Sequence, residues 1–171
     1  RSRPAPAFAS SFEPGEPQPQ LKAADGDISL LIGDGPEAPY TAKAKVGYSG
    51  LHALRYRGHG AGGRTQLFAV DIPVDSDTAL SWLVLPEIVD GDTVASTGVG
   101  IDLVFDDGRR LSQLGALDQH GAGITAAQQA ASKTLYPQQW ARKQVRVGDI
   151  ASLRGHSIRA IELELQPVGD G

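Results

Sequence analysis

Runs in which apolar and polar residues alternate constrain the fold of this chain more than any other feature. In the clearest run, residues 98–105, one face carries four large apolar side chains, Val99, Ile101, Leu103 and Phe105. The other face carries Gly98, Gly100 and Asp102. Because successive side chains of a β-strand point to opposite faces, this two-residue period predicts a half-buried strand.

Similar runs occur along the whole chain. We expect further strands over residues 8–13, 28–32, 52–57, 68–72, 78–85, 140–147 and 157–166. The run at 78–85 is apolar on both faces, which predicts a central strand. Asp107 and Gly108 predict a hairpin turn that leads from the 98–105 strand into residues 109–114. A long polar loop over 117–139 is expected to hold one short helix near residues 126–131.

The composition fits many short strands joined by tight turns. The 171 residues include 21 Gly and 11 Pro, and this length suits one domain with a real core. We therefore predict an all-β fold, a two-sheet antiparallel β-sandwich, over residues 8–171. Residues 1–7 are predicted to be a disordered tail or linker, because they are rich in Pro, Ala and Arg and have no periodicity.

Charge argues against two classes of partner. The formal net charge is −4, and no cluster of Lys and Arg exceeds three residues, so neither nucleic acid nor an anionic membrane is an expected partner. No apolar run approaches the roughly 20 residues that cross a bilayer.

The absence of Cys excludes disulfides and thiolate metal sites.

Motifs of catalysis are missing from the sequence. It contains no P-loop, no dinucleotide-binding fingerprint, no nucleophile elbow and no His-Glu-x-x-His helix. A pair of carboxylates for glycoside hydrolysis needs only two acids that face one cleft, so that alternative stays open.

The long loop begins with the densest group of polar residues, Asp118, Gln119 and His120. These side chains could hydrogen-bond sugar hydroxyls, since Asp accepts, Gln both donates and accepts, and neutral His does either. The alternative is a structural role, in which Asp118 caps a turn and His120 packs under the loop. As metal ligands, Asp118 and His120 lack an evident third partner.

Two aromatic residues mark the end of the same loop. Tyr136 and Trp140 flank a stretch that ends in Gln139, and an aromatic ring can stack on the apolar face of a pyranose. We therefore include Tyr136, Gln139 and Trp140 among the candidate ligand-binding residues. The alternative for Trp140 is a core residue at the start of a strand, and Trp82, in the middle of a predicted strand, is also expected in the core.

Glu13 is the candidate metal ligand. It follows Phe12 in the predicted first strand, where it could pair with Arg55 or Arg57 at the surface, or bind a hard cation through oxygen. A Ca²⁺ ion would need further oxygens, among them backbone carbonyls near Ser49 and Gly50.

Several segments resemble a known group of modules. Phe12-Glu13-x-Gly15 and Ser49-Gly50-x-x-Ala53-Leu54-Arg55 look like the opening of galactose-binding-like carbohydrate-binding modules of jelly-roll type. Residues 10–19, 53–58, 114–121 and 131–140 resemble the N-terminal accessory region of bacterial family 92 glycoside hydrolases, the calcium-dependent α-mannosidases. The likeness extends over most of residues 8–165.

The resemblance implies a non-catalytic, monomeric accessory module of a secreted, extracellular enzyme. Such a module would pack beside the catalytic domain of its parent protein, bind mannose-containing glycan weakly and hold a structural calcium ion. The mannosidase activity is not carried over, because it belongs to the family's catalytic domain. Two alternatives stay open: an interdomain support that binds no sugar, and a small carbohydrate-active enzyme that uses a carboxylate pair.

Overall fold

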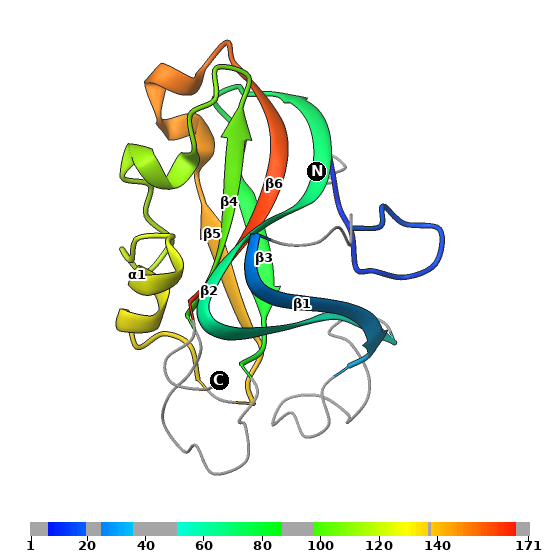
Figure 1. Cartoon of the computed structure of the whole chain (residues 1–171). Coiled ribbons are helices and arrows are strands. Elements are labelled where there is room, and N and C mark those ends of the chain that lie inside the picture. Colours follow the sequence, from blue (N-terminus) through cyan, green and yellow to red (C-terminus); the bar gives the residue numbers. More distant parts are fainter. Residues whose placement is uncertain (1–6, 20–24, 36–50, 87–97, 137, 167–171) are drawn as a thin grey trace.

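The computed structural model describes residues 7–19, 25–35, 51–86, 98–136 and 138–166, and it is built mainly of antiparallel strands (Figure 1). The strands are β1 (Asp25–Asp34), β2 (His52–Pro73), β3 (Leu80–Val84), β4 (Gly98–Phe105), β5 (Ala141–Val145) and β6 (Ser157–Gln166). The α-helix α1 spans Ala126–Ala131, and three short 3₁₀ turns are η1 (Leu111–Leu114), η2 (Val147–Asp149) and η3 (Ala151–Leu153). The predicted all-β sandwich is confirmed, whereas the jelly-roll strand order stays a prediction.

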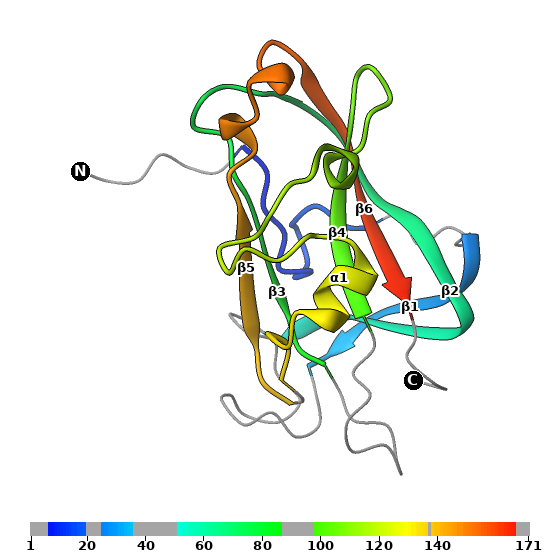
Figure 2. The same cartoon turned by 90° about the vertical axis from the view of Figure 1, so that its left-hand side faces the viewer.

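The strands form two sheets in the described part of the chain. One has four strands in the order β1-β2-β6-β4, and the other pairs β3 with β5. Figure 2 shows β3 and β5 on one side of the molecule and β4, β6 and β2 on the other. β2 joins two neighbours because its first part pairs with β1 and its later part, from Gly63 to Pro73, pairs with β6.

The inward faces of the sheets build the core. The apolar face of β4 supplies Val99, Leu103 and Phe105, and Leu163 and Leu165 follow the same period on β6. Their buried neighbours include Val84 on β3 and Val145 on β5. The alternation seen in the sequence is therefore the alternation between the core and the outer face.

The outer face of β4 is covered by the segment 111–136. Gly98 and Gly100 lie on this face, and a Cβ placed on either one would overlap the carbonyl oxygen of Ala126 or Ile124. The two glycines thus let the chain around α1 lie directly on the strand. The Thr125 hydroxyl begins α1 by accepting a hydrogen bond from the Gln128 N–H (3.2 Å), so the helix expected at 126–131 is confirmed.

Several predicted elements are wrong in detail. Residues 8–13 form no strand: Phe12 has a positive φ of 64°, and the rings of Phe8 and Phe12 pack on Phe68 instead. The runs at 52–57 and 68–72 belong to one continuous strand, β2. β3 is not buried on both faces, because Ser81 and Leu83 are exposed.

The predicted hairpin after β4 is half right. The turn forms, with the Phe105 N–H donating to the Arg109 carbonyl (2.9 Å) and Gly108 at a φ of 83°. Residues 111–114 then form η1 rather than a returning strand, because the Asp102 carboxylate on β4 accepts the Ser112 N–H (3.0 Å) and holds the chain across the sheet.

We expect Gly100→Ala to destabilise the fold by about 1–3 kcal/mol, since its methyl group would collide with backbone rather than with a flexible side chain. Gly33→Ala on β1 is the matched control, because no atom lies within 4 Å of the position that a Cβ would take there. Urea unfolding measures the free energy of unfolding of both variants. Equal stability of the two variants would contradict the close approach of the segment around α1 to β4.

Candidate functional site

Asp118 lies at the start of the long loop and is buried, with 6% of its surface exposed. Its Oδ1 accepts the N–H groups of His120 (2.8 Å) and Ala122 (3.0 Å), which closes the tight turn at residues 118–121. Its Oδ2 accepts the side-chain amide of Gln129 on α1 (2.9 Å). The carboxylate thus joins the loop to the helix that follows it.

Lys143 on β5 is the cationic partner of Asp118. Both side chains are fully buried, with Nζ 3.4 Å from Oδ2 of Asp118, and Nζ also donates to the hydroxyl of Thr134. A buried charge needs such a partner, because desolvation penalises an ion that is left alone. Lys143 was not among the residues predicted from the sequence, although the two-residue period of 140–147 places it on the same face as Val145.

These contacts set the charge state of Asp118. Burial disfavours the charged carboxylate, but hydrogen bonds from Gln129, Ala122 and His120, together with the nearby ammonium of Lys143, outweigh it. The pKa of Asp118 is therefore lowered below its ordinary value, and the carboxylate is ionised at neutral pH.

Gln119 fastens the loop to the edge of β5. Its side-chain amide donates to the carbonyl of Arg142 (2.6 Å) and accepts the N–H of Gln144 (2.8 Å), so it occupies the place of a peptide group in a neighbouring strand. A strand edge left uncovered can pair with other chains, and Gln119 covers part of this one.

The other sequence-predicted ligand residues lie apart from these buried contacts. His120 and Gln139 are exposed, and Tyr136 is exposed to 59%. Trp140 is half-buried, with its indole nitrogen in the interior. His120 does not pack under the loop, whereas Asp118 does organise a turn, as its structural alternative predicted.

An open cleft of about 480 Å³ lies between the loop and β5. It is lined by residues 117–119 on one side and by residues 144–146 and 149–150 on the other. Of the six predicted ligand residues, Asp118 and Gln119 line it, and His120, Tyr136, Gln139 and Trp140 do not. The ion pair of Arg146 and Asp149 (3.1 Å) at its wall was not predicted from the sequence.

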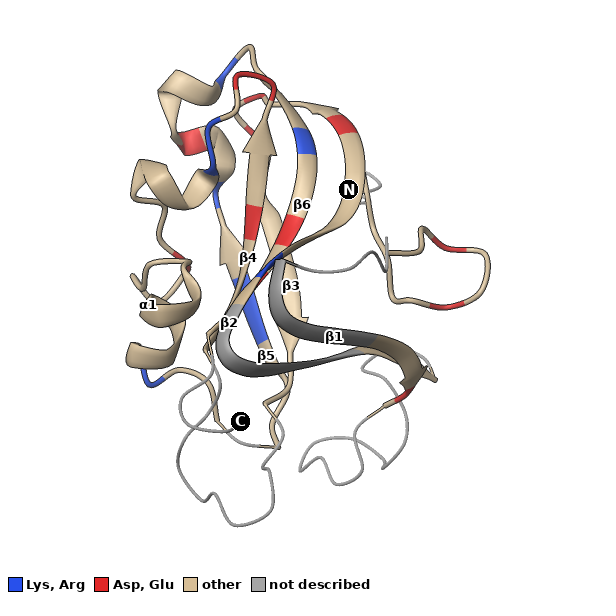
Figure 3. Ribbon diagram, viewed as in Figure 1, with Lys and Arg blue, Asp and Glu red and all other residues tan. Residues whose placement is uncertain are grey.

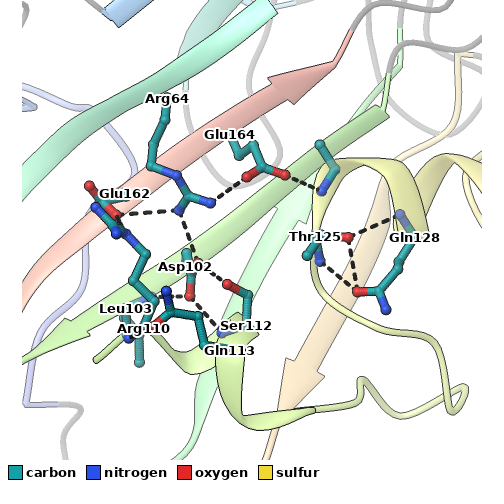
Figure 4. Close-up of polar contacts among 11 residues, drawn as sticks. Arg64, Asp102, Leu103, Arg110, Ser112, Gln113, Thr125, Gln128, Glu162 and Glu164 are labelled. Carbon is teal, nitrogen blue, oxygen red and sulfur yellow. Dashed lines mark hydrogen bonds and ion pairs between the residues drawn. The ribbon is translucent and has the colours of Figure 1, made fainter. Parts of the chain in front are cut away.

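A second polar cluster crosses the outer face of the larger sheet. Asp102 on β4 and Glu162 on β6 are neighbours in the sheet, where Figure 3 shows acidic positions side by side. Figure 4 shows Arg64 reaching Asp102 (2.9 Å), Glu162 (3.3 Å) and Glu164, while Arg110 binds Glu162 (2.8 Å).

The cluster also fixes the loop. Glu164 accepts the N–H of Ala126 (2.7 Å) at the start of α1, and Asp102 accepts the N–H of Ser112 (3.0 Å) in η1 (Figure 4). The side-chain hydrogen bond of Arg110 with Glu162 raises the pKa of Arg110. Each of the three carboxylates is engaged by arginine, so this cluster is an electrostatic support for the segment 111–136.

Glu13 has a different partner from the arginines considered for it. Its Oε1 accepts the His52 N–H (2.8 Å) and its Oε2 lies 2.6 Å from His52 Nδ1, and these two hydrogen bonds lower the pKa of Glu13. Ser49 and Gly50, the other predicted metal-site residues, lie outside the described residues.

Within the described ranges, one group of three metal-ligating side chains comes together: Asp106, Asp107 and His156, close to the surface. Hydrogen bonds account for this group, because His156 Nδ1 lies 2.7 Å from Asp106 and the Arg109 guanidinium donates to Asp107 (2.6 Å). The pKa values of Asp106 and Asp107 are both lowered, chiefly by hydrogen bonds from His156 and from the Arg109 N–H.

No family of known proteins matches the sequence, and no curated protein matches it.

The buried pair yields a stability prediction. We expect Asp118→Ala to cost about 3–5 kcal/mol, because it leaves the Lys143 ammonium buried without its carboxylate, and Asp118→Ala with Lys143→Met to recover part of that loss. Asp71→Asn is the control, since it breaks an exposed ion pair with Arg159 and should change stability by less than about 0.5 kcal/mol. Urea unfolding at neutral pH measures the free energy of unfolding of each variant. Equal losses of that free energy in Asp118→Ala and Asp71→Asn would contradict the role of the buried pair.

The lowered pKa of Asp118 predicts an acid-sensitive fold. A carboxyl group whose pKa is depressed by folding stabilises the protein above its ordinary value, near 3.8, and loses that contribution as the pH falls through the folded value. Asp118→Asn should therefore show a shallower loss of unfolding free energy below about pH 4 than the parent. Parallel pH profiles for the two proteins would rule out this contribution.

Proposed function

We propose that this chain is a non-catalytic carbohydrate-binding accessory module of a secreted bacterial glycoside hydrolase, and that it binds mannose-containing glycan weakly. The observation that carries the proposal is the open cleft beside residues 117–119, whose loop is fixed to β5 by Asp118 and Gln119. Its volume falls within the range of small-ligand sites. The choice of mannose, the secreted location and the parent enzyme come from the sequence resemblance.

The chemistry of the cleft suits a neutral, hydroxylated ligand. Its charged lining residues, Asp118, Arg146 and Asp149, are each paired with an opposite charge, so no unpaired charge calls for an ionic ligand. An open site with few polar contacts supports a modest affinity, with a Kd in the millimolar to high-micromolar range, or about 4–6 kcal/mol.

Four carboxylates around the long loop support a binding role rather than hydrolysis. A glycosidase needs an acid and a second carboxylate that face the substrate across an open site. Asp102, Glu162 and Glu164 are instead held by Arg64 and Arg110, and Asp118 is buried against Lys143.

Calcium at Glu13 stays a prediction that the described contacts do not favour. Both carboxylate oxygens of Glu13 are engaged by His52, and the one group of three possible metal ligands found in the described ranges lies elsewhere. A structural ion must raise the melting temperature, so an unchanged melting temperature after chelation and calcium addition would show that no such ion is held.

Two exposed leucines bear on the rival function, an interdomain support. Leu31 on β1 and Leu51 just before β2 are exposed to 60% and 63%. A contiguous apolar patch around these residues would be typical of a surface that packs against another domain.

Isothermal titration calorimetry of the isolated chain with α-linked mannooligosaccharides distinguishes a carbohydrate-binding module from an interdomain support. We expect saturable binding with a Kd of about 0.1–1 mM, and none to a charged oligosaccharide of similar length. Absence of binding to any neutral glycan, together with tight association with a neighbouring domain through Leu31 and Leu51, would establish the support in place of the binding module.

A further inference from the structure

The cleft has two unlike walls, which come from segments far apart in the sequence. The loop wall is held in place because Gln119 hydrogen-bonds the backbone of β5 on both sides of Lys143. The opposite wall begins where β5 ends, as the chain turns through η2 and brings Asp149 next to Arg146. The shape of the cleft therefore depends on backbone contacts that exist without a ligand.

Most polar atoms of the loop wall are already used. Both carboxylate oxygens of Asp118 accept hydrogen bonds from the protein, and the amide oxygen and nitrogen of Gln119 are bound to β5. A sugar hydroxyl could recruit Asp118 or Gln119 only by displacing one of these contacts, which would leave buried or edge groups unpaired.

The opposite wall has free capacity for hydrogen bonds. Arg146 and Asp149 are joined by one contact, Nε to Oδ2 (3.1 Å), and their side chains are 68% and 61% exposed. Within the described ranges, the two terminal nitrogens of Arg146 and Oδ1 of Asp149 have no other partner. Nitrogen donors thus lie beside a carboxylate acceptor, a combination that can bind two adjacent hydroxyl groups at once.

Apolar contact is available in the same cleft. Leu117 is 55% exposed at the loop wall, and Ile150 and the buried Val145 line the opposite side. The C–H face of a pyranose ring is apolar, so Leu117 and Ile150 offer a surface for such a ring in the same cleft as Arg146 and Asp149.

We propose that Arg146 and Asp149 form the hydroxyl-binding pair of this cleft, and that its ligand is a neutral pyranoside with two adjacent hydroxyl groups. This inference rests on the proposed carbohydrate-binding function and moves its polar contacts from Asp118 and Gln119 to the end of β5. Asp118 and Gln119 then act as positioning residues that hold the loop wall.

The test is isothermal titration calorimetry with an α-linked mannooligosaccharide. The proteins titrated are the parent chain and the variants Asp149→Asn, Arg146→Lys and Arg146→Gln. We expect Asp149→Asn and Arg146→Gln to bind about tenfold or more weakly, because each loses a charge-assisted hydrogen bond to a hydroxyl group, and Arg146→Lys, which keeps a cationic donor, to lose less. Asp71→Asn is the matched control: it removes a carboxylate from another exposed ion pair, with Arg159 at 3.1 Å, outside the cleft. Thermal melting of each variant verifies that it is folded.

The outcomes separate this inference from the function on which it rests. If the parent binds no neutral glycan, the proposed function fails. If the parent binds and folded Asp149→Asn and Arg146→Gln bind as tightly as Asp71→Asn, the function stands and the assignment to this pair is overturned. A loss of binding in Tyr136→Ala alone would move the site to the exposed aromatic residue at the end of the loop.

Discussion

The buried ion pair of Asp118 and Lys143 is the contact on which the position of the long loop depends. The charges lie between the small sheet and the long loop, where neither reaches water. Gln129 and the backbone N–H groups of His120 and Ala122 donate further hydrogen bonds to the Asp118 carboxylate. A hydrogen-bonded buried pair contributes little net stability over an apolar substitute, but a half-broken pair is costly. The pair therefore specifies one position of the loop.

Two further sets of contacts hold the long loop against the larger sheet. The glycines at 98 and 100 remove side chains from the outer face of β4, so that the chain around α1 can lie against it. Next to them, Arg64 neutralises carboxylates on β4 and β6, and one of these, Glu164, caps the start of α1 (Figure 4). Between these supports and the buried pair, the loop is fixed onto both sheets, and the cleft at its start is preorganised.

The period of the sequence predicted the strands that face the core, because burial on one side of a sheet leaves a two-residue pattern. The pattern mispredicts residues whose tertiary contacts override it. Phe8 and Phe12 lie in a sequence that resembles a strand, yet their rings pack on Phe68 from a turn. The polar residues of the long loop predict it as the candidate functional segment. The roles within it could not be assigned, because the partners of Asp118 and Gln119 come from residues 129 and 142–144, and no local signal joins them.

The central claim is that a neutral glycan occupies the cleft between the loop and the end of β5. Titration of the isotope-labelled chain with a mannooligosaccharide, followed by backbone amide chemical shifts, tests it most directly. The account predicts saturable shifts concentrated in residues 117–119 and 144–150, with little change on β1 and β2. Shifts confined to residues 136–140, or a spectrum that stays unchanged at millimolar glycan, would contradict it.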